Sequence, residues 1–358
     1  MSIKIFASGD IVNNTGNSNF VDENLKTIIQ EHDISFCNFE APIETSSNKI
    51  IKAGPHIFQN KDSIKYTKEV GFNLFSLANN HIYDYGETGL KNTIDKIKEE
   101  NIKYLGAGLN YEEAYQPLII DINNTRIGFI AASEAQFGCL TENNEKSGYA
   151  WINSNKIDKT ILMLRNQVDL IILSSHAGAE STYVPLPEWR DRYKYLCDIG
   201  VNLILGHHPH VPQGYEEYNT SYIFYSLGNF YFDTANHEKT SNDSYSLSIN
   251  IENNKIKNID FIYHKNINNQ TTLVDEDKIN FSIENLNNIL KINYEENVNE
   301  LVINYFKSFY YNYYKTALSN ELDKITTNQA ILLLHNIKID SHRYIVQRAL
   351  EKLYEEKN

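Results

Sequence analysis

Hydrophobic residues in the first 230 positions of the chain form short continuous runs rather than strict alternations with polar residues. Runs of this kind indicate strands that are buried on both faces, as in a parallel sheet covered by helices. Eight segments show the pattern: residues 3–7, 34–39, 72–78, 102–105, 126–132, 168–174, 201–205 and 222–226.

Amphipathic patterns with helical spacing lie between these runs and predict helices at residues 22–32, 61–70, 89–100, 156–167 and 187–199. Alternation of strands and helices is typical of an α/β domain. Residues 244–250 and 255–264 instead alternate apolar and polar positions on either side of Asn253 and Asn254, which predicts a hairpin that closes the domain.

After about residue 280 the pattern becomes helical, at residues 283–293, 298–319, 328–337 and 341–356. We therefore expect an α/β domain over residues 1–270 and a helical cap over residues 271–358 that packs on it. Aromatic side chains crowd the middle of this segment, and we favour a core-filling role for them over an aromatic substrate surface. They are Phe306, Phe309, Tyr310, Tyr311, Tyr313 and Tyr314.

The charge of the chain limits its partners. It carries 46 acidic and 33 basic residues, a net charge of −13, and it has no run of Lys or Arg. Such a protein repels nucleic acid and anionic membranes, so we expect neither as a partner. It also repels a phosphorylated substrate, unless bound divalent cations supply positive charge locally.

The cysteines and the amino terminus indicate a cytoplasmic protein. Cys37, Cys139 and Cys197 are far apart and odd in number, which favours buried free thiols over disulfides. The first ten residues reach polar positions too soon for a secretory signal. Since no apolar run approaches the roughly 18–20 residues of a membrane helix, we expect no membrane anchor in this chain.

Candidate chemistry gathers where the predicted strands end. The polar residues there are Asp10, Asn38, Glu40, Asn79, Asn80, His81, Asp84, His176, Glu180, His207, His208, His210 and Asn229. In an open parallel sheet these ends share one edge, where ligands bind. One such residue is readily explained as a helix cap or a hydrogen-bonded histidine. Six polar strand ends together would be costly to bury without a shared cation.

Six of these side chains combine hard oxygen with imidazole nitrogen and include no thiolate: Asp10, Glu40, Asn80, His176, His208 and His210. This set of ligands is suited to a site for Mn²⁺, Fe²⁺ or Zn²⁺. It does not resemble a structural zinc site, which is rich in cysteine. Because six ligands exceed what one catalytic ion takes while keeping an open position, two ions about 3.5–4 Å apart fit the number, with Glu40 as the bridge. We therefore expect one or two divalent ions.

Several of these segments resemble the capsule-synthesis CapA family, the poly-γ-glutamate synthesis proteins. Asn79-Asn80-His81 with Asp84, Gly206-His207-His208-Pro209-His210 and Ser226-Leu227-Gly228-Asn229-Phe230 occur in the family's order and spacing. The resemblance covers roughly residues 1–265 and includes Gly9-Asp10, Asn38 to Pro42 and His176 to Glu180. It implies the fold of calcineurin-type metallophosphoesterases, a four-layer αββα sandwich, here with a helical extension at the carboxyl end.

The resemblance also implies roles for the ligands. Asp10 and His210 would hold one metal, Asn80, His176 and His208 the second, and Glu40 would bridge them. This chain differs from phosphoesterases in two features of the metal site and its pocket. Val12 occupies the position of a histidine ligand, so the first metal lacks one ligand, and Ala177 and Ser181 replace aromatic residues of the pocket.

The function that follows is a metal-dependent hydrolase, in particular a phosphoesterase, linked to the biosynthesis of a capsule or another anionic polymer. Its catalytic residues would be His81, which protonates the leaving group, with Asp84 and Glu180. Its substrate would be small and phosphorylated or carboxylate-rich, and would be contacted by Lys52, His207 and Asn229.

Some of these residues have competing interpretations. For Lys52 we favour a solvated loop residue, Asp84 could instead cap a helix that starts near Gly86, and His207 could lie behind the ligands. A second function is also open: a non-hydrolytic accessory or binding protein that uses the metal site to hold carboxylates or phosphates. The chain has no phosphate-loop motif for amide ligation, and a scaffold that keeps the cage only as structure is a third possibility.

Overall fold

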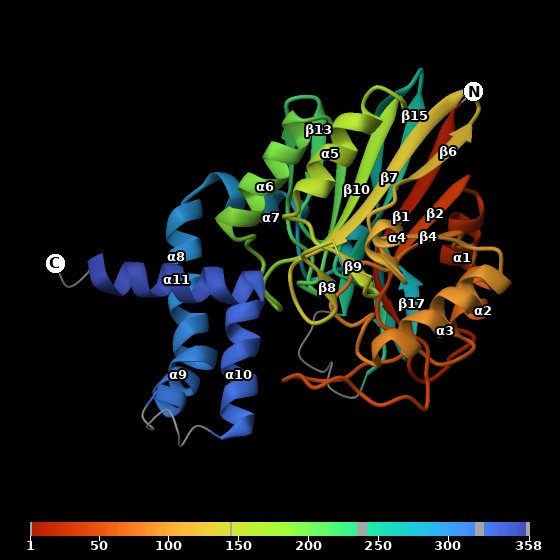
Figure 1. The fold of residues 1–358 in the computed structure, drawn as a ribbon. Helices are drawn as coiled ribbons and strands as arrows, with labels where there is room; N and C mark the ends of the chain where they lie inside the picture. The colour runs from red at the N-terminus through yellow and green to blue at the C-terminus, as the bar shows by residue number, and fades with distance from the viewer. Residues whose placement is uncertain (1, 144, 235–241, 319–325, 356–358) are drawn as a thin grey trace.

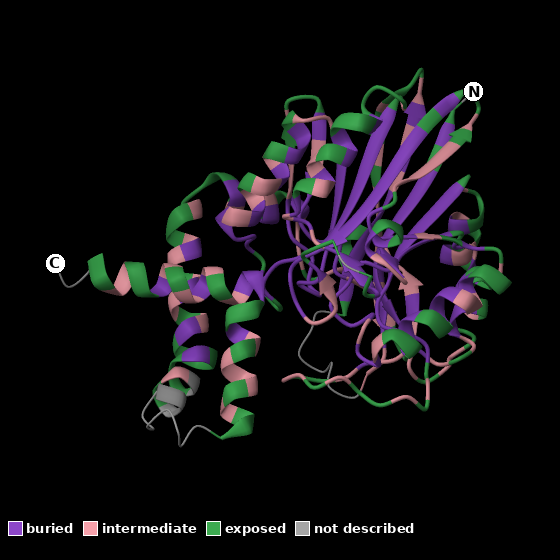
Figure 2. Ribbon diagram, in the orientation of Figure 1, coloured by how far each residue is buried: buried purple, intermediate pink, exposed green. Residues whose placement is uncertain are grey.

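The computed structural model describes residues 2–143, 145–234, 242–318 and 326–355. Two β-sheets lie face to face, and helices cover the outer face of each sheet (Figure 1). The arrangement is the expected four-layer αββα metallophosphoesterase-like sandwich, and further helices follow it at the carboxyl end. Most strand residues in the middle of the sandwich are buried (Figure 2).

The first sheet has the order β17-β16-β15-β1-β2-β3-β4, and β14 also pairs with β1. Strands β1 to β4 are parallel, whereas β15, β16 and β17 join through antiparallel pairs. The predicted hairpin is confirmed as β15 and β16, and its turn residues Asn253 and Asn254 have φ angles of 52° and 60°. The strands are β1 (Ile3–Val12), β2 (Ile34–Phe39), β3 (Leu74–Ser76), β4 (Lys103–Leu105), β14 (Asn229–Phe232), β15 (Asp243–Glu252), β16 (Lys255–Ile267) and β17 (Gln270–Leu273).

The second sheet has the order β12-β13-β11-β10-β7-β6, with parallel central strands and antiparallel edges. The hydrophobic runs that suggest one parallel sheet are therefore divided between two sheets. The strands are β6 (Leu118–Ile122), β7 (Thr125–Ser133), β10 (Leu170–His176), β11 (Leu203–His207), β12 (Tyr215–Tyr218) and β13 (Ser221–Phe224), with a small third sheet of β5 (Ala107–Gly108), β8 (Cys139–Leu140) and β9 (Gly148–Ala150).

Apolar side chains fill three layers between these elements. Ile5 and Phe36 of the first sheet meet Phe129 and Leu203 of the second in the middle layer. The outer faces pack against α1 (Glu23–Gln30), α2 (Ser63–Val70) and α3 (Gly86–Glu99) on the first sheet, and α4 (Tyr111–Ala114), α5 (Asn155–Leu164) and α6 (Pro187–Asp198) on the second. Burial of each aliphatic or aromatic side chain contributes about 1.5–3 kcal/mol to the free energy of folding. This core therefore holds the strand ends in place.

The carboxyl-terminal helices pack against the side of the sandwich that carries α6 (Figure 1). They are α7 (Ile283–Lys291), α8 (Tyr294–Tyr305), a π-helical turn η2 (Phe306–Tyr310), α9 (Tyr311–Leu318), α10 (Thr327–Lys338) and α11 (Asp340–Glu355), preceded by the short η1 (Glu276–Lys278). The helices predicted at 298–319 and 341–356 are present, although residues 319 and 356 lie outside the described ranges. The domain boundary at residue 270 stays a prediction.

The aromatic residues of this segment divide into two groups. Phe306 and Tyr310 are buried in the cluster that contains α5 and α6, as a core-filling role requires. Phe309 and Tyr311 are 52% and 51% exposed, so the expectation is wrong for these two. The side chain of Tyr313 lies outside the described part of the structure.

Cys37 and Cys197 are buried free thiols as predicted, whereas Cys139 is free but only partly buried, and burial raises the pKa of all three. Among the residues described, no helix combines the length and the apolar character needed to cross a membrane.

Candidate metal centre

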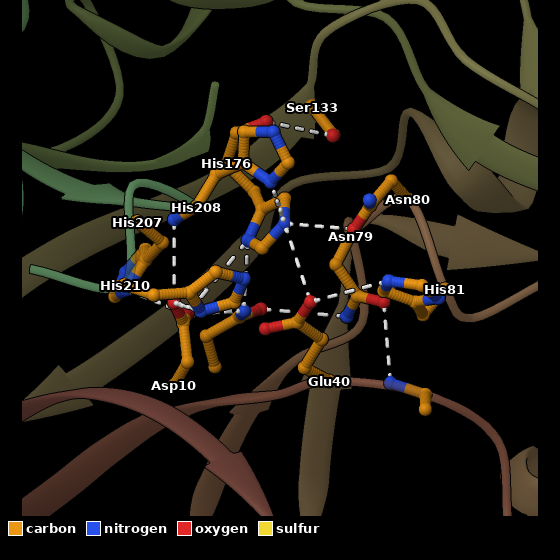
Figure 3. A network of polar contacts seen from close by, with 12 residues as sticks. Asp10, Glu40, Asn79, Asn80, His81, Ser133, His176, His207, His208 and His210 are labelled. Carbon is orange, nitrogen blue, oxygen red and sulfur yellow. Dashed lines mark hydrogen bonds and ion pairs between the residues drawn. The ribbon is translucent and has the colours of Figure 1, made fainter. Parts of the chain in front are cut away.

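The carboxyl ends of strands from both sheets meet at one place, and the six predicted ligands meet there (Figure 3). Asp10 lies near the end of β1, and Glu40 directly follows β2. Asn80 follows β3, and His176 is the last residue of β10. The loop after β11 brings His208 and His210, so segments up to 200 residues apart in sequence build one cluster.

His176 is at the centre of one group of ligand atoms. Its Nε2 atom lies 3.0 Å from Asn80 Oδ1, 3.0 Å from His208 Nδ1 and 3.7 Å from Glu40 Oε1. Ligands that each bind Zn²⁺ at about 2.0–2.2 Å are separated by similar distances. These atoms are therefore placed to hold one ion, and they include the three residues assigned to the second metal by resemblance.

A second group surrounds Asp10. His210 Nδ1 lies 3.5 Å from Asp10 Oδ2 and 2.9 Å from Asn229 Oδ1. Strands β1 and β14 place Asn229 directly beside Asp10. The position that lacks a histidine is occupied by Val12, which packs in a small apolar cluster, so Asn229 supplies the nearby oxygen instead.

Ligand atoms also cluster in two separate sets, Asp10 with Glu40 and His176, and Glu180 with His208 and His210. Within each set the atoms lie within 4.8 Å of one another. Glu180, which was predicted as a catalytic residue, thus lies among the candidate metal ligands.

The carboxylate of Glu40 shows that the site fits a cation. Both of its oxygens are buried, and neither accepts a hydrogen bond from any residue in the described ranges. Burial raises the pKa of Glu40 well above its usual value, and the charge of Asp10 adds to the rise, although His210 opposes it. A buried carboxylate with no partner is costly, and a divalent ion bound by hard oxygen and imidazole ligands removes that cost.

The cluster lowers the pKa of Asp10 and raises the pKa of His210. Burial acts to raise the pKa of Asp10, but hydrogen bonds from His176, His207 and His210 hold it well below the usual value. Burial acts to lower the pKa of His210, but Glu40 and Asp10 raise it to about 10. The carboxylates thus draw positive charge into the site, which is the electrostatic setting that a metal ion needs.

Backbone strain is concentrated beside the ligands. Ala41, Ser181, His208 and His210 have φ angles of 89°, 57°, 94° and 60°, a region that side chains other than glycine seldom adopt. Each costs about 1–3 kcal/mol, and such residues persist where the surrounding structure enforces them. Gly9 is required for a related reason: a Cβ atom there would lie 1.8 Å from the carbonyl oxygen of Gly228.

His81 and Asp84 form a pair that faces the ligands. Asp84 Oδ2 lies 2.7 Å from His81 Nδ1 and accepts a hydrogen bond from the backbone N–H of Ile57 at 2.8 Å. Lys52 donates to Asp84 Oδ1. The Nε2 atom of His81 is left facing Glu40 Oε1 at 4.0 Å. The helix-cap interpretation of Asp84 is wrong, since α3 begins at Gly86 without a side-chain cap.

Two of the predicted substrate contacts need correction. The side chain of Lys52 is only 5% exposed and pairs with Asp84, so it is neither a solvated loop residue nor free to bind substrate. His207 is fully buried, with Nδ1 3.5 Å from Asp10 Oδ1, because it ends β11 in the middle of the sheet. Asn229 contacts His210, as described above.

A cavity of about 930 Å³ opens in front of the cluster. His81, Glu180 and His210 contribute to its inner wall. Its opposite wall comes from the carboxyl-terminal helices, including Tyr305 and Phe309, whose ring centroids lie 4.6 Å apart. Of the two exposed aromatic residues, Phe309 lines the cavity, as the alternative interpretation of an aromatic substrate surface requires, whereas Tyr311 is not among the lining residues.

Sequence reasoning missed Glu134, which follows β7. His208 Nε2 lies 3.2 Å from Glu134 Oε1, and Glu134 is fully buried. A polar residue just after the apolar run 126–132 repeats the pattern of the other strand ends. That signal could have identified it.

Comparisons with known proteins identify the family of the chain. A family model described as "Bacterial capsule synthesis protein PGA_cap" matches residues 4–234. The chain is 32% identical over 231 residues to a capsule biosynthesis protein CapA of Bacillus anthracis, and 30% identical over 211 residues to a PGA biosynthesis protein CapA of Bacillus subtilis. These matches cover 63% and 58% of this chain, but only 56% of each relative, so the chain spans about half of their length.

Solved structures with a similar shape include a hypothetical protein from Thermus thermophilus, with a TM-score of 0.48 and 14% identity over 74% of this chain and 99% of that one. A putative 5'-nucleotidase from Staphylococcus aureus has a TM-score of 0.46 and 12% identity over 81% of this chain and 58% of that one. The family match includes every strand end of the cluster, from Asp10 to Asn229. The chain belongs to the bacterial capsule synthesis family PGA_cap.

Proposed function

We propose that this chain is a metal-dependent phosphoesterase that acts in the synthesis of a capsule or of a poly-γ-glutamate type polymer. The observation that carries the proposal is the unpartnered, buried carboxylate of Glu40 within a cluster of imidazole and oxygen ligands. One or two ions of Mn²⁺, Fe²⁺ or Zn²⁺ would be held by Asp10, Glu40, Asn80, His176, His208 and His210. Such ions activate water and neutralise charge on a phosphoryl group.

The remaining residues would position the substrate and move a proton. His81 lines the cavity, and its Nδ1 is held by Asp84, so Nε2 is directed to where a leaving oxygen would sit. We assign it the delivery of a proton to that oxygen. Lys52 keeps Asp84 in position, and Glu180 lies at the cavity wall beside His208 and His210.

The cavity suggests a small substrate. Its volume of about 930 Å³ lies in the range of small-molecule sites. The part of its lining that the structure describes has two carboxylates, Glu180 and Glu300, and no lysine or arginine. One phosphate at the metal centre joined to an uncharged group would suit this lining, since a second anionic group would be repelled.

The test is a panel of phosphomonoesters and phosphodiesters, assayed with chelator-treated protein before and after addition of Mn²⁺. We expect turnover that requires the metal and is lost in Asp10→Asn and His208→Ala. Glu216→Gln is a matched control, since Glu216 lies on β12, away from the cluster, and pairs with Arg190 of α6. Absence of turnover on every ester with Mn²⁺, Fe²⁺ and Zn²⁺ would remove the proposal.

A second candidate is the non-hydrolytic accessory role, which is favoured by a relative from Mycobacterium tuberculosis that is 23% identical over 208 residues and is named a probable polyglutamine synthesis accessory protein. In that case the cluster would bind carboxylates of the polymer without cleaving it. Metal-dependent binding of poly-γ-glutamate without ester turnover would support this role over the hydrolase. A cytoplasmic location and the absence of a nucleic-acid partner stay predictions.

A further inference from the structure

The amino end of α11 reaches the metal cluster through one buried carboxylate. Glu134 Oε2 accepts hydrogen bonds from the backbone N–H of Ser341 at 2.8 Å and from its hydroxyl at 2.6 Å. The other oxygen, Oε1, faces His208 Nε2 at 3.2 Å and accepts a bond from Gln136 Nε2 at 3.2 Å. Glu134 and Ser341 are both fully buried.

A reciprocal pair of bonds holds the two segments together. Asp340 Oδ2 accepts from the backbone N–H of Ala135 at 2.9 Å, while Glu134 accepts from the backbone N–H of Ser341. Trp151 Nε1 donates to the same Asp340 oxygen at 2.9 Å, and Trp189 Nε1 donates to the Ser341 hydroxyl at 2.9 Å. The start of α11 is therefore fixed against the end of β7 on several sides.

We infer that Ser341, acting through Glu134, positions the metal ligand His208. The inference rests on the proposed metal site and adds to it a part of the chain beyond residues 4–234, the stretch that the family model matches. Glu134 Oε1 lies 3.2 Å from His208 Nε2, within ion-pair distance, and a proton held on that nitrogen would leave Nδ1, the atom 3.0 Å from His176 Nε2, free to bind the ion.

The physical reason is that a metal-binding histidine needs its other nitrogen held. A carboxylate in that place fixes the tautomer and the ring orientation and makes the ligand more basic. Ser341 gives the buried carboxyl group of Glu134 two donors at the amino end of a 16-residue helix, where the helix dipole favours an anion. The carboxyl-terminal helices would thus be required for tight metal binding as well as for the cavity wall.

The test measures the dissociation constant of Mn²⁺ by calorimetry on chelator-treated full-length protein. We expect Glu134→Gln to weaken binding by about 10–100-fold, the usual effect of losing such a partner. Ser341→Ala removes one of two donors and should weaken binding several-fold while leaving the fold intact. Thermal unfolding of each metal-free variant shows whether the fold is retained.

Two controls separate positioning from general loosening. Glu188→Gln removes the negative charge that pairs with Arg348 at 2.6 Å and ties α11 to α6, without touching Glu134. Ser221→Ala removes a buried serine hydrogen bond of similar kind, 2.7 Å to Val201 O, far from the cluster. Both should keep the wild-type affinity for Mn²⁺, even where the unfolding temperature falls.

The outcomes are distinct. If wild-type protein binds Mn²⁺ and folded Ser341→Ala and Glu134→Gln bind it equally well, the inference fails and the proposed metal site stands. If Glu188→Gln weakens binding as much as Ser341→Ala, the effect is general loosening, which also overturns the inference. If the wild-type protein binds none of the three ions Mn²⁺, Fe²⁺ and Zn²⁺, the proposed function fails as well.

Discussion

Replacement of Glu40 by glutamine should stabilise the metal-free protein and reduce the stability that bound metal adds. Glu40 is buried, and its carboxylate oxygens have no hydrogen-bond partner in the described parts of the chain. Its pKa is raised by burial. An acid with a pKa above its unfolded value costs stability at every pH above that unfolded value. At pH 7.5, Glu40→Gln should therefore stabilise the metal-free protein, by about 1–3 kcal/mol for one unsatisfied buried group.

With metal the variant should lose most or all of this advantage over the wild type. A cation at a hundred times its dissociation constant stabilises the wild type by about 2.7 kcal/mol, whereas a variant with hundredfold weaker binding gains only about 0.4 kcal/mol. The metal-free advantage of the variant is thus largely cancelled or reversed. A change of 1 kcal/mol shifts the unfolding temperature by about 2–4 °C in a chain of 150–250 residues and by less in this longer chain, so a difference of about 2 kcal/mol is measurable by circular dichroism.

The assay compares wild type, Glu40→Gln and Glu188→Gln, each with chelator and with saturating Mn²⁺. Glu188 lies away from the cluster and pairs with Arg348, so its variant should respond to metal as the wild type does. The reasoning is refuted if Glu40→Gln destabilises the metal-free protein, or if Mn²⁺ stabilises it as much as it stabilises the wild type.

Three further predictions test other parts of the account. His81→Gln should lower kcat by about 10²–10⁴-fold on an alkyl phosphoester and much less on an activated aryl ester, whose leaving group needs no proton; equal losses would contradict the acid role. Phe309→Ala should raise KM for an aryl phosphoester several-fold while leaving inhibition by inorganic phosphate unchanged, because Phe309 lines the far wall of the cavity; an unchanged KM would exclude the contact. Burial lowers the pKa of His264 to about 3, so the unfolded chain binds a proton that the folded chain does not, and stability falls as pH drops from 6.5 towards 3. His264→Gln should remove up to about 1.4 kcal/mol per pH unit of that loss in urea unfolding at pH 4–6, and an unchanged slope would contradict it.

The sequence predicts most strands and helices because continuous apolar runs and helical spacing are local signals, whereas the four-layer arrangement followed from the resemblance to the CapA family. It does not predict which strands share a sheet, since residues 3–7 and 126–132 look alike and yet lie in different sheets. The edge strand β12 was missed because Tyr215–Tyr218 has charged residues at its centre, as an edge with solvent on one side allows.

The meeting of the six ligands follows from a simple rule, that parallel strands end at one edge. Partners that depend on distant segments could not be found in this way. Lys52 lies in a polar loop, and only the fold places it against Asp84. Glu134 and Ser341 are 207 positions apart, so no local pattern links them. Burial of His207 likewise depends on the second sheet packing against the first, through contacts such as that with Phe36.

The most direct test of the metal centre is anomalous X-ray scattering from crystals grown with Mn²⁺. We predict one or two peaks enclosed by Asp10, Glu40, Asn80, His176, His208 and His210, with the Glu40 carboxylate in contact with an ion. Crystals that show no peak there, with Glu40 instead hydrogen-bonded to protein groups, would contradict the central claim.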